Sequence, residues 1–247
     1  MNIKYKGRTR KIENGLTVRE ALAEEIKNSE YEVIGCLYNN DYRNLETPIE
    51  EGANIELIDI SSKEGMKIYV RTIVYIMGKA FESLYPKEKL MVEYQLGNAM
   101  YCKCDNIRIT KEFTEKLKQK MQEIIEKDLS IKKVEMTRKE AQKFYDETDT
   151  SKGRLQFDFE ENDPIYMYYC EKYYNYCYGT LANRTGVIKI FDVVKYANGF
   201  LIRYPSSKAP TKMPEFQETK KLAWALEEFE KIHSVLDVLT VYKLKKQ

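Results

Sequence analysis

The order of short elements in the first 60 residues constrains the fold more than any other feature of the chain. Apolar and polar residues alternate in the sequence NIKYK, and Gly7 then marks a turn, which predicts a hairpin of two strands. Thr17 and Glu20 have the spacing of a capping box in front of apolar residues at helical intervals, which predicts a helix. Two further strands are predicted over residues 33–38 and 54–60. The order strand, strand, helix, strand, strand is typical of a β-grasp fold.

The predicted hairpin is followed by the sequence LTVREAL and later by PIEEGANIELI. In these features the segment resembles a TGS domain. The resemblance implies a small appended module that helps to bind RNA or ligands and is not catalytic. The segment also lacks a glycine-rich phosphate loop. We therefore expect residues 1–62 to form a TGS-like β-grasp domain.

The rest of the chain mixes predicted helices with predicted strands. The helices are expected over residues 66–84, 110–127, 137–145 and 215–233, and the strands over residues 90–94, 100–104, 131–136, 165–170, 187–194 and 199–204. Gly97-Asn98 marks the turn of a hairpin, and Thr137 with Glu140 forms a second capping box. No repeat or low-complexity stretch is present in the sequence, and the mixture predicts an α+β fold.

Three further motifs carry a second resemblance. They are a hinge, SSKEGMKI, a helix that ends in LYP, and the sequence VEMTRKEAQKFY. Together with the TGS-like segment, they resemble the N-terminal half of threonyl-tRNA synthetase, whose second part is the editing domain shared with alanyl-type synthetases. The resemblance implies an editing-like α+β domain over residues 63–214, followed by a C-terminal helix over residues 215–247.

The chemistry of that editing domain depends on side chains that this chain has lost. The family carries two histidines four residues apart on one helix face, and a cysteine and a histidine in a later Cys-x-Gly-x-His segment. The matching positions are here Tyr75, Lys79, Cys177 and Leu181, and an acidic position before the cysteine is Asn175. Leucine can neither donate, accept nor ligate. We therefore expect no catalytic residues and no deacylation of tRNA by the usual route.

Histidine is almost absent from the chain, since His233 is the only one. Histidine is the usual general base near neutral pH and the commonest metal ligand, so the composition argues against histidine-based hydrolases and histidine-ligated zinc enzymes. Four thiolates would suit zinc, and the chain contains Cys102-x-Cys104 and a later pair, Cys170 and Cys177. Their spacing is not a familiar zinc pattern, and buried free cysteines are far commoner, so no metal site is predicted.

Charge and hydropathy limit the partners of the chain. The formal net charge of +2 gives no strong overall attraction to nucleic acid. The most apolar predicted helix, residues 66–84, is interrupted by Lys67, Arg71 and Lys79, so no membrane span is predicted. The N-terminal sequence lacks the apolar core of a signal peptide, and five cysteines, an odd count, favour a reducing compartment. We expect a cytoplasmic protein.

The sequence AWALEEFEKIHSVLDVLTVYKL carries a third resemblance. It is similar to the segment that leads towards the kinase domain in bacterial nucleoside kinases resembling uridine kinase. The chain contains no G-x-x-x-x-G-K-[ST] sequence, so it has no phosphate cradle of its own. The resemblance implies that ATP and Mg²⁺ would belong to a separate kinase domain, and no cofactor is expected in this region.

The remaining candidate site is a ligand cleft formed by Arg71, Tyr75, Lys79, Asn175 and Cys177. Arg71 and Lys79 lie two helical turns apart on about the same face, and their permanent positive charges suit phosphate. The alternative is that Lys79 fills the former site or points to solvent. A tyrosine-rich stretch over residues 166–178 offers rings for stacking on bases, although the alternation of strands favours a core role for about half of them.

Three classes of function remain open from the sequence. The favoured one is a non-catalytic nucleotide- or RNA-binding, regulatory region of a uridine kinase-like nucleoside kinase. The alternatives are a residual aminoacyl-tRNA editing hydrolase that uses Cys177, and a purely structural oligomerisation module. The expected partners are accordingly a small nucleotide, a tRNA-like ligand or a second copy of the chain.

Overall fold

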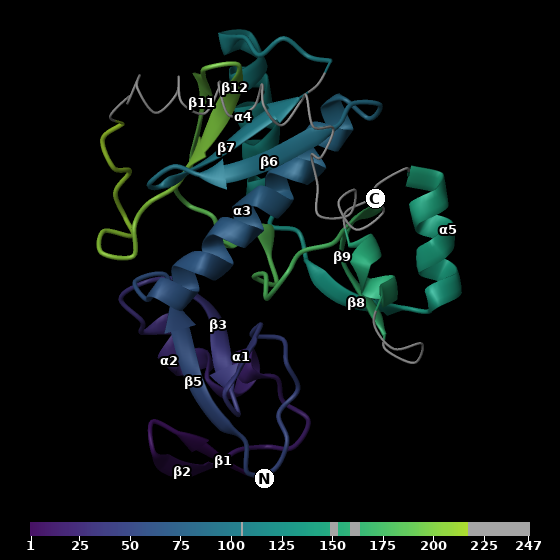
Figure 1. Cartoon of the computed structure of the whole chain (residues 1–247). Helices are drawn as coiled ribbons and strands as arrows, with labels where there is room; N and C mark the ends of the chain where they lie inside the picture. Colours follow the sequence, from purple (N-terminus) through teal and green to yellow (C-terminus); the bar gives the residue numbers. More distant parts are fainter. Residues whose placement is uncertain (105, 149–152, 159–163, 217–247) are drawn as a thin grey trace. The chain divides into compact units, whose positions relative to one another are not determined.

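The computed structural model describes residues 1–104, 106–148, 153–158 and 164–216 (Figure 1). The chain divides into two compact units. The first consists of Met1–Lys132, Cys170–Tyr173 and Cys177–Pro214, and the second of Lys133–Tyr169, Tyr174–Tyr176 and Glu215–Gln247. The domain boundaries predicted after residues 62 and 214 remain predictions. Most of the helix predicted over residues 215–233, with His233, lies outside the described residues.

The N-terminal part of the first unit is a five-stranded sheet in the order β2-β1-β5-β3-β4. Its elements are β1 (Asn2–Tyr5), β2 (Arg8–Lys11), α1 (Val18–Ala21), α2 (Ala23–Lys27), β3 (Val33–Tyr38), β4 (Asp41–Arg43) and β5 (Asn54–Asp59). The first capping box is confirmed, because the Thr17 hydroxyl accepts from the Glu20 amide at 3.3 Å and the Glu20 carboxylate accepts from the Thr17 amide at 2.8 Å. β1 runs parallel to β5, which places the first and last strands side by side as a β-grasp order requires.

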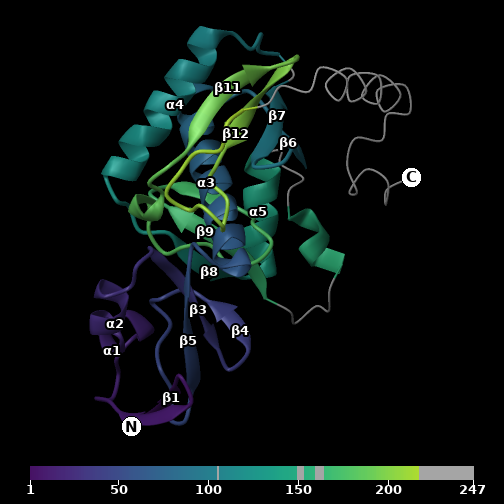
Figure 2. The ribbon, with the colours of Figure 1, turned by 90° about the vertical axis from the view of Figure 1, so that its left-hand side faces the viewer.

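The long helix α3 (Lys63–Leu84) begins at Ser62, whose hydroxyl accepts a hydrogen bond from the Gly65 amide at 3.0 Å. Helices α3 and α4 (Lys111–Glu126) pack against an antiparallel sheet in the order β11-β12-β7-β6 (Figure 2). Its strands are β6 (Leu90–Gln95), β7 (Ala99–Cys104), β11 (Asp192–Tyr196) and β12 (Gly199–Arg203). One core joins Ile73 of α3, Leu117 of α4 and Phe200 of β12.

The second unit contains α5 (Arg138–Thr148) and the 3₁₀-helix η1 (Arg154–Asp158). Strands β8 (Lys132–Met136), β9 (Ile165–Cys170) and β10 (Tyr173–Asn175) form a three-stranded sheet in the order β10-β9-β8. The second capping box is also confirmed, because the Glu140 carboxylate accepts from the Thr137 amide at 2.9 Å and the Thr137 hydroxyl accepts from the Glu140 amide at 3.3 Å. The α+β class predicted from the sequence is therefore confirmed.

The prediction of one strand over residues 187–194 was wrong. The chain instead forms the 3₁₀-helix η2 (Thr185–Val187), and β11 begins only at Asp192. Between them, the Tyr69 hydroxyl accepts from the amides of Lys189 and Ile190 and donates to the Ile190 carbonyl. The Tyr69 side chain thus forms the hydrogen bonds with these backbone groups that a neighbouring strand would otherwise form.

Strand β10 was missed because the turn before it gives no sequence signal. Glu171 and Lys172 have φ angles of 43° and 67°, a conformation that hairpin turns usually reach with glycine, asparagine or aspartate. Within the described residues, no helix is both long and apolar enough to cross a membrane.

Candidate functional site

The candidate site lies where one polar face of α3 meets the backbone of residues 170–190. Four side chains of this face, three or four residues apart, form hydrogen bonds with that backbone. They are Tyr69, Thr72, Tyr75 and Lys79. Most of this backbone is not paired with a neighbouring strand. These side chains therefore provide the hydrogen-bond partners that a neighbouring strand provides within a sheet.

Tyr75 is buried, and its hydroxyl donates to the carbonyl oxygen of Tyr173 at 3.2 Å. The two rings meet edge to face, with 5.1 Å between their centroids. Burial, and then the neighbouring groups of Cys170 and Tyr173, raises the pKa of Tyr75 far above its ordinary value. Tyr75 therefore remains a protonated donor and cannot serve as a general base.

Lys79 closes the turn between β9 and β10. Its Nζ donates to the carbonyl oxygens of Cys170 at 2.9 Å and Glu171 at 3.1 Å. The Glu171 carboxylate lies 3.6 Å from the same nitrogen, and the Lys79 side chain is only 13% exposed. Two of the three ammonium donors thus bond backbone carbonyl groups, and the nearby carboxylate balances the charge. The ammonium group of Lys79 therefore stabilises a turn whose two central residues, Glu171 and Lys172, have unfavourable positive φ angles.

Arg71 lies against the later loop of the same unit. A Cβ atom added to Gly179, which has a φ of +86°, would stand 2.9 Å from Cζ of Arg71. Arg71 has no carboxylate partner among the described residues. Cys177 is half-buried and lies near enough to Tyr75 to contribute to the rise of its pKa. Arg71, Tyr75, Lys79 and Cys177 belong to the first unit, whereas Asn175 belongs to the second, and the ligand cleft that they were expected to form stays a prediction.

The position that the resemblance assigns to the last histidine is filled by the fully buried side chain of Leu181. The next residue, Ala182, donates its amide to the Thr72 hydroxyl at 2.9 Å. Sequence analysis missed both Thr72 and Tyr69. Their spacing of three and six residues before Tyr75 was the signal that could have found them, because it continues the same face of the helix.

The thiols with a shifted pKa are poor nucleophiles. Burial raises the pKa of Cys170, although Lys79 opposes the rise, and burial raises the pKa of Cys102 as well. Burial also raises the pKa of Cys36 to about 12. Because the thiolate is the attacking form, these three cysteines are unreactive near neutral pH. In the part of the chain that the structure describes, no group of three or more His, Cys, Asp or Glu residues is placed to hold a metal ion.

Comparison with known proteins finds threonine–tRNA ligases among the relatives of the chain. A threonine–tRNA ligase of Caldanaerobacter subterraneus is 28% identical over 196 residues, which are 78% of this chain and 30% of the relative. A threonine–tRNA ligase of Clostridium tetani is 27% identical over 203 residues, 81% of this chain and 32% of the relative. A probable cytoplasmic threonine–tRNA ligase of Enterocytozoon bieneusi is 28% identical over 206 residues, 81% of this chain and 31% of the relative. No family model matches the chain.

The chain is distantly homologous to these ligases. It spans about 30% of their length, in their N-terminal region. This homology agrees with the predicted fold of a TGS-like part followed by an editing-like part. None of the three relatives is a nucleoside kinase. The kinase parentage with its ATP and Mg²⁺, the oligomeric state and the cytoplasmic location therefore remain predictions.

Proposed function

We propose that the chain is a non-catalytic RNA-binding region that uses an editing-type fold to hold the end of a tRNA-like RNA. The observation that carries the loss of catalysis is the use of Tyr75 and Lys79 as anchors of backbone carbonyl groups. These are the positions that the resemblance assigns to two histidines. A general base must take up a proton, whereas burial raises the pKa of Tyr75 and keeps its phenol protonated, and the Lys79 side chain is engaged with two backbone carbonyl groups.

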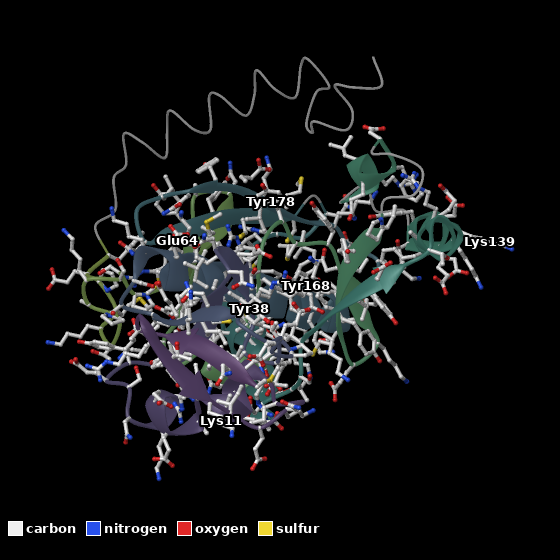
Figure 3. All side chains as sticks on the ribbon, turned by 90° about the horizontal axis from the view of Figure 1, so that it is seen from below. Lys11, Tyr38, Glu64, Lys139, Tyr168 and Tyr178 are labelled. Carbon is white, nitrogen blue, oxygen red and sulfur yellow. The ribbon has the colours of Figure 1, made fainter. Side chains whose placement is uncertain are left out.

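Two features beside the anchored face, the exposed ring of Tyr178 and the half-buried guanidinium of Arg71, support RNA as the ligand. Tyr178 is 83% exposed, far more than is usual for a tyrosine, and it precedes the glycine that Arg71 lies against (Figure 3). An exposed aromatic ring stacks on a base, and a guanidinium without a carboxylate partner binds phosphate. The relatives are named as tRNA ligases, so a single-stranded tRNA end is the RNA that best suits these two groups.

The proposal predicts measurable binding of a tRNA acceptor-stem hairpin that ends in unpaired nucleotides. Arg71→Ala and Tyr178→Ala are each expected to weaken binding about tenfold, because a stacked base or a phosphate contact is worth about 1–3 kcal/mol. Fluorescence anisotropy with labelled RNA at a fixed salt concentration measures the effect. Lys139→Ala serves as the matched control, because Lys139 is an exposed cation of the second unit, and it should change binding less than twofold.

A blunt hairpin without unpaired nucleotides should bind about as weakly as the two variants do. Equal binding of the wild type, Arg71→Ala and Tyr178→Ala would contradict the proposal. If no RNA binds and the chain instead forms a concentration-dependent oligomer by light scattering, the structural alternative is the better account.

The same proposal predicts no turnover in an editing reaction. Release of seryl or threonyl groups from charged tRNA should not exceed the spontaneous rate, because the acid–base help worth about 10²–10⁴ in rate has no side chain to supply it. The measurement uses radiolabelled aminoacyl-tRNA under multiple-turnover conditions. Turnover that Cys177→Ala abolishes would instead establish the residual hydrolase.

A further inference from the structure

A second exposed tyrosine, Tyr42, lies in β4, the strand at the edge of the N-terminal sheet. Of the tyrosines that the structure describes, only Tyr42 and Tyr178 are exposed. Exposed aromatic rings are the groups on which the bases of single-stranded RNA stack. The function proposed above uses the ring of Tyr178 and leaves the ring of Tyr42 without a role.

One hydrogen bond joins the segments that carry these two tyrosines. Oγ1 of Thr180 donates to the carbonyl oxygen of Tyr42 at 2.7 Å, although 138 positions separate the two residues. Thr180 follows Tyr178 by two residues, which span at most about 7 Å of backbone. The loop of Tyr178 and the edge strand of Tyr42 therefore lie side by side within the first unit.

The register of the sheet places the Tyr42 side chain on the same side of the sheet as α3. Tyr42 pairs with Leu37 of β3, and directly opposed residues of antiparallel strands share a face. Leu37 shares that face with Gly35, two residues earlier. A Cβ atom added to Gly35 would stand 3.0 Å from Cδ1 of Ile68 in α3. Arg71 follows Ile68 by three residues, so Tyr42 lies on the side of the sheet where α3 carries the proposed phosphate-binding group.

A second contact holds the loop of Tyr178 to the N-terminal part of the unit. The buried side chain of Asn183 donates from Nδ2 to the Glu46 carboxylate at 2.7 Å. Its Oδ1 accepts from the guanidinium of Arg19 in α1 at 3.1 Å. The loop is thus bound to this part at Thr180 and again at Asn183. Such support keeps the two tyrosines in a fixed relation and lowers the entropy cost of binding a ligand across both.

We propose that the ring of Tyr42 stacks on a second base of the unpaired RNA end, so that the site extends from the loop of Tyr178 onto the N-terminal sheet. This inference rests on the proposed function and defines its ligand more closely, as an end with at least two unpaired nucleotides and a phosphate at Arg71. Every base has a π-face, so stacking on two tyrosines gives no strong preference for sequence.

The test uses two RNA hairpins with the same stem, one ending in four unpaired nucleotides and the other in a single one. Fluorescence anisotropy at a fixed salt concentration measures binding to the full chain. Tyr42→Ala is expected to weaken binding of the four-nucleotide hairpin about tenfold, the effect of one lost stacked base. Tyr42→Phe keeps the ring and should change binding less than twofold.

The double variant Tyr42→Ala with Tyr178→Ala separates two stacked bases from one. Independent losses add in free energy, so this variant should bind the four-nucleotide hairpin about a hundredfold more weakly than the wild type does. The single-nucleotide hairpin should lose only about tenfold, because one base can occupy only one ring. A loss of only about tenfold for both hairpins would contradict the inference.

Phe216→Ala is the matched control, since Phe216 belongs to the second unit and is 43% exposed, against 42% for Tyr42. It should change binding less than twofold. Circular dichroism melting shows whether each variant is folded, and Tyr42→Thr takes the place of Tyr42→Ala if that variant is not, because threonine suits a strand.

The outcomes distinguish this inference from the function on which it rests. If Tyr178→Ala weakens binding of the four-nucleotide hairpin and Tyr42→Ala does not, the role of Tyr42 is wrong and the proposed function stands. If the wild type binds neither hairpin, both are wrong. The role of Tyr42 in stacking is also contradicted if Tyr42→Phe or Phe216→Ala weakens binding as much as Tyr42→Ala does.

Discussion

Tyr69→Phe is expected to lower the free energy of unfolding by about 3 kcal/mol, since it leaves three backbone groups without their partner. The Tyr69 hydroxyl donates to the Ile190 carbonyl at 2.7 Å and accepts from the Ile190 amide at 2.9 Å and the Lys189 amide at 3.2 Å. Phenylalanine keeps the volume of the buried ring, so the loss reports the hydrogen bonds and not a cavity. Urea denaturation followed by circular dichroism measures the change.

Tyr75→Phe is the matched control for that experiment. It removes a hydroxyl of the same helix face that donates to the Tyr173 carbonyl, and should cost about 1 kcal/mol. If Tyr69→Phe proves no more destabilising than Tyr75→Phe, the segment between η2 and β11 does not depend on the Tyr69 hydroxyl. This result would also contradict the explanation that the Tyr69 hydroxyl prevents a single strand over residues 187–194.

Lys79→Met is expected to lower the free energy of unfolding by about 2–3 kcal/mol. Methionine keeps much of the aliphatic stem but removes the donors that hold the carbonyl groups of Cys170 and Glu171. Those carbonyl groups belong to a turn in which two residues other than glycine, Glu171 and Lys172, have positive φ angles. The variant therefore loses hydrogen bonds that offset the backbone strain of this turn. Thermal and urea unfolding of the full chain give the difference, and faster amide exchange in residues 170–173 would locate it.

Lys67→Met tests whether charge removal alone explains the loss. Lys67 lies on the same helix, is exposed, and pairs with Glu64 at 2.9 Å. A surface ion pair of this kind contributes at most about 1 kcal/mol. An effect of Lys79→Met no larger than that of Lys67→Met would show that the turn is not held by Lys79, and a free Lys79 would again be a candidate for phosphate.

The sequence was sufficient for the elements whose signals are local. The bounds of β3 (Val33–Tyr38) and the two capping boxes at Thr17 and Thr137 follow from residues within one or two turns of each other. The absence of histidine from positions 75, 79 and 181 can also be read from sequence, since no fold can supply a side chain that the chain lacks. For the candidate site, helical spacing correctly placed Tyr75 and Lys79 on one face of α3.

Tertiary structure decided which groups the side chains on this face of α3 bind. Phosphate binding, filling of the former site and exposure to solvent are equally compatible with the sequence around Lys79, and only the carbonyl groups of residues 170 and 171, about 90 positions away, select among them. The same applies to Tyr69, whose hydroxyl interrupts a predicted strand 120 residues later. Hydrogen bonds between distant segments override local propensity wherever backbone groups lack a strand partner, and no local pattern records where those groups will lie.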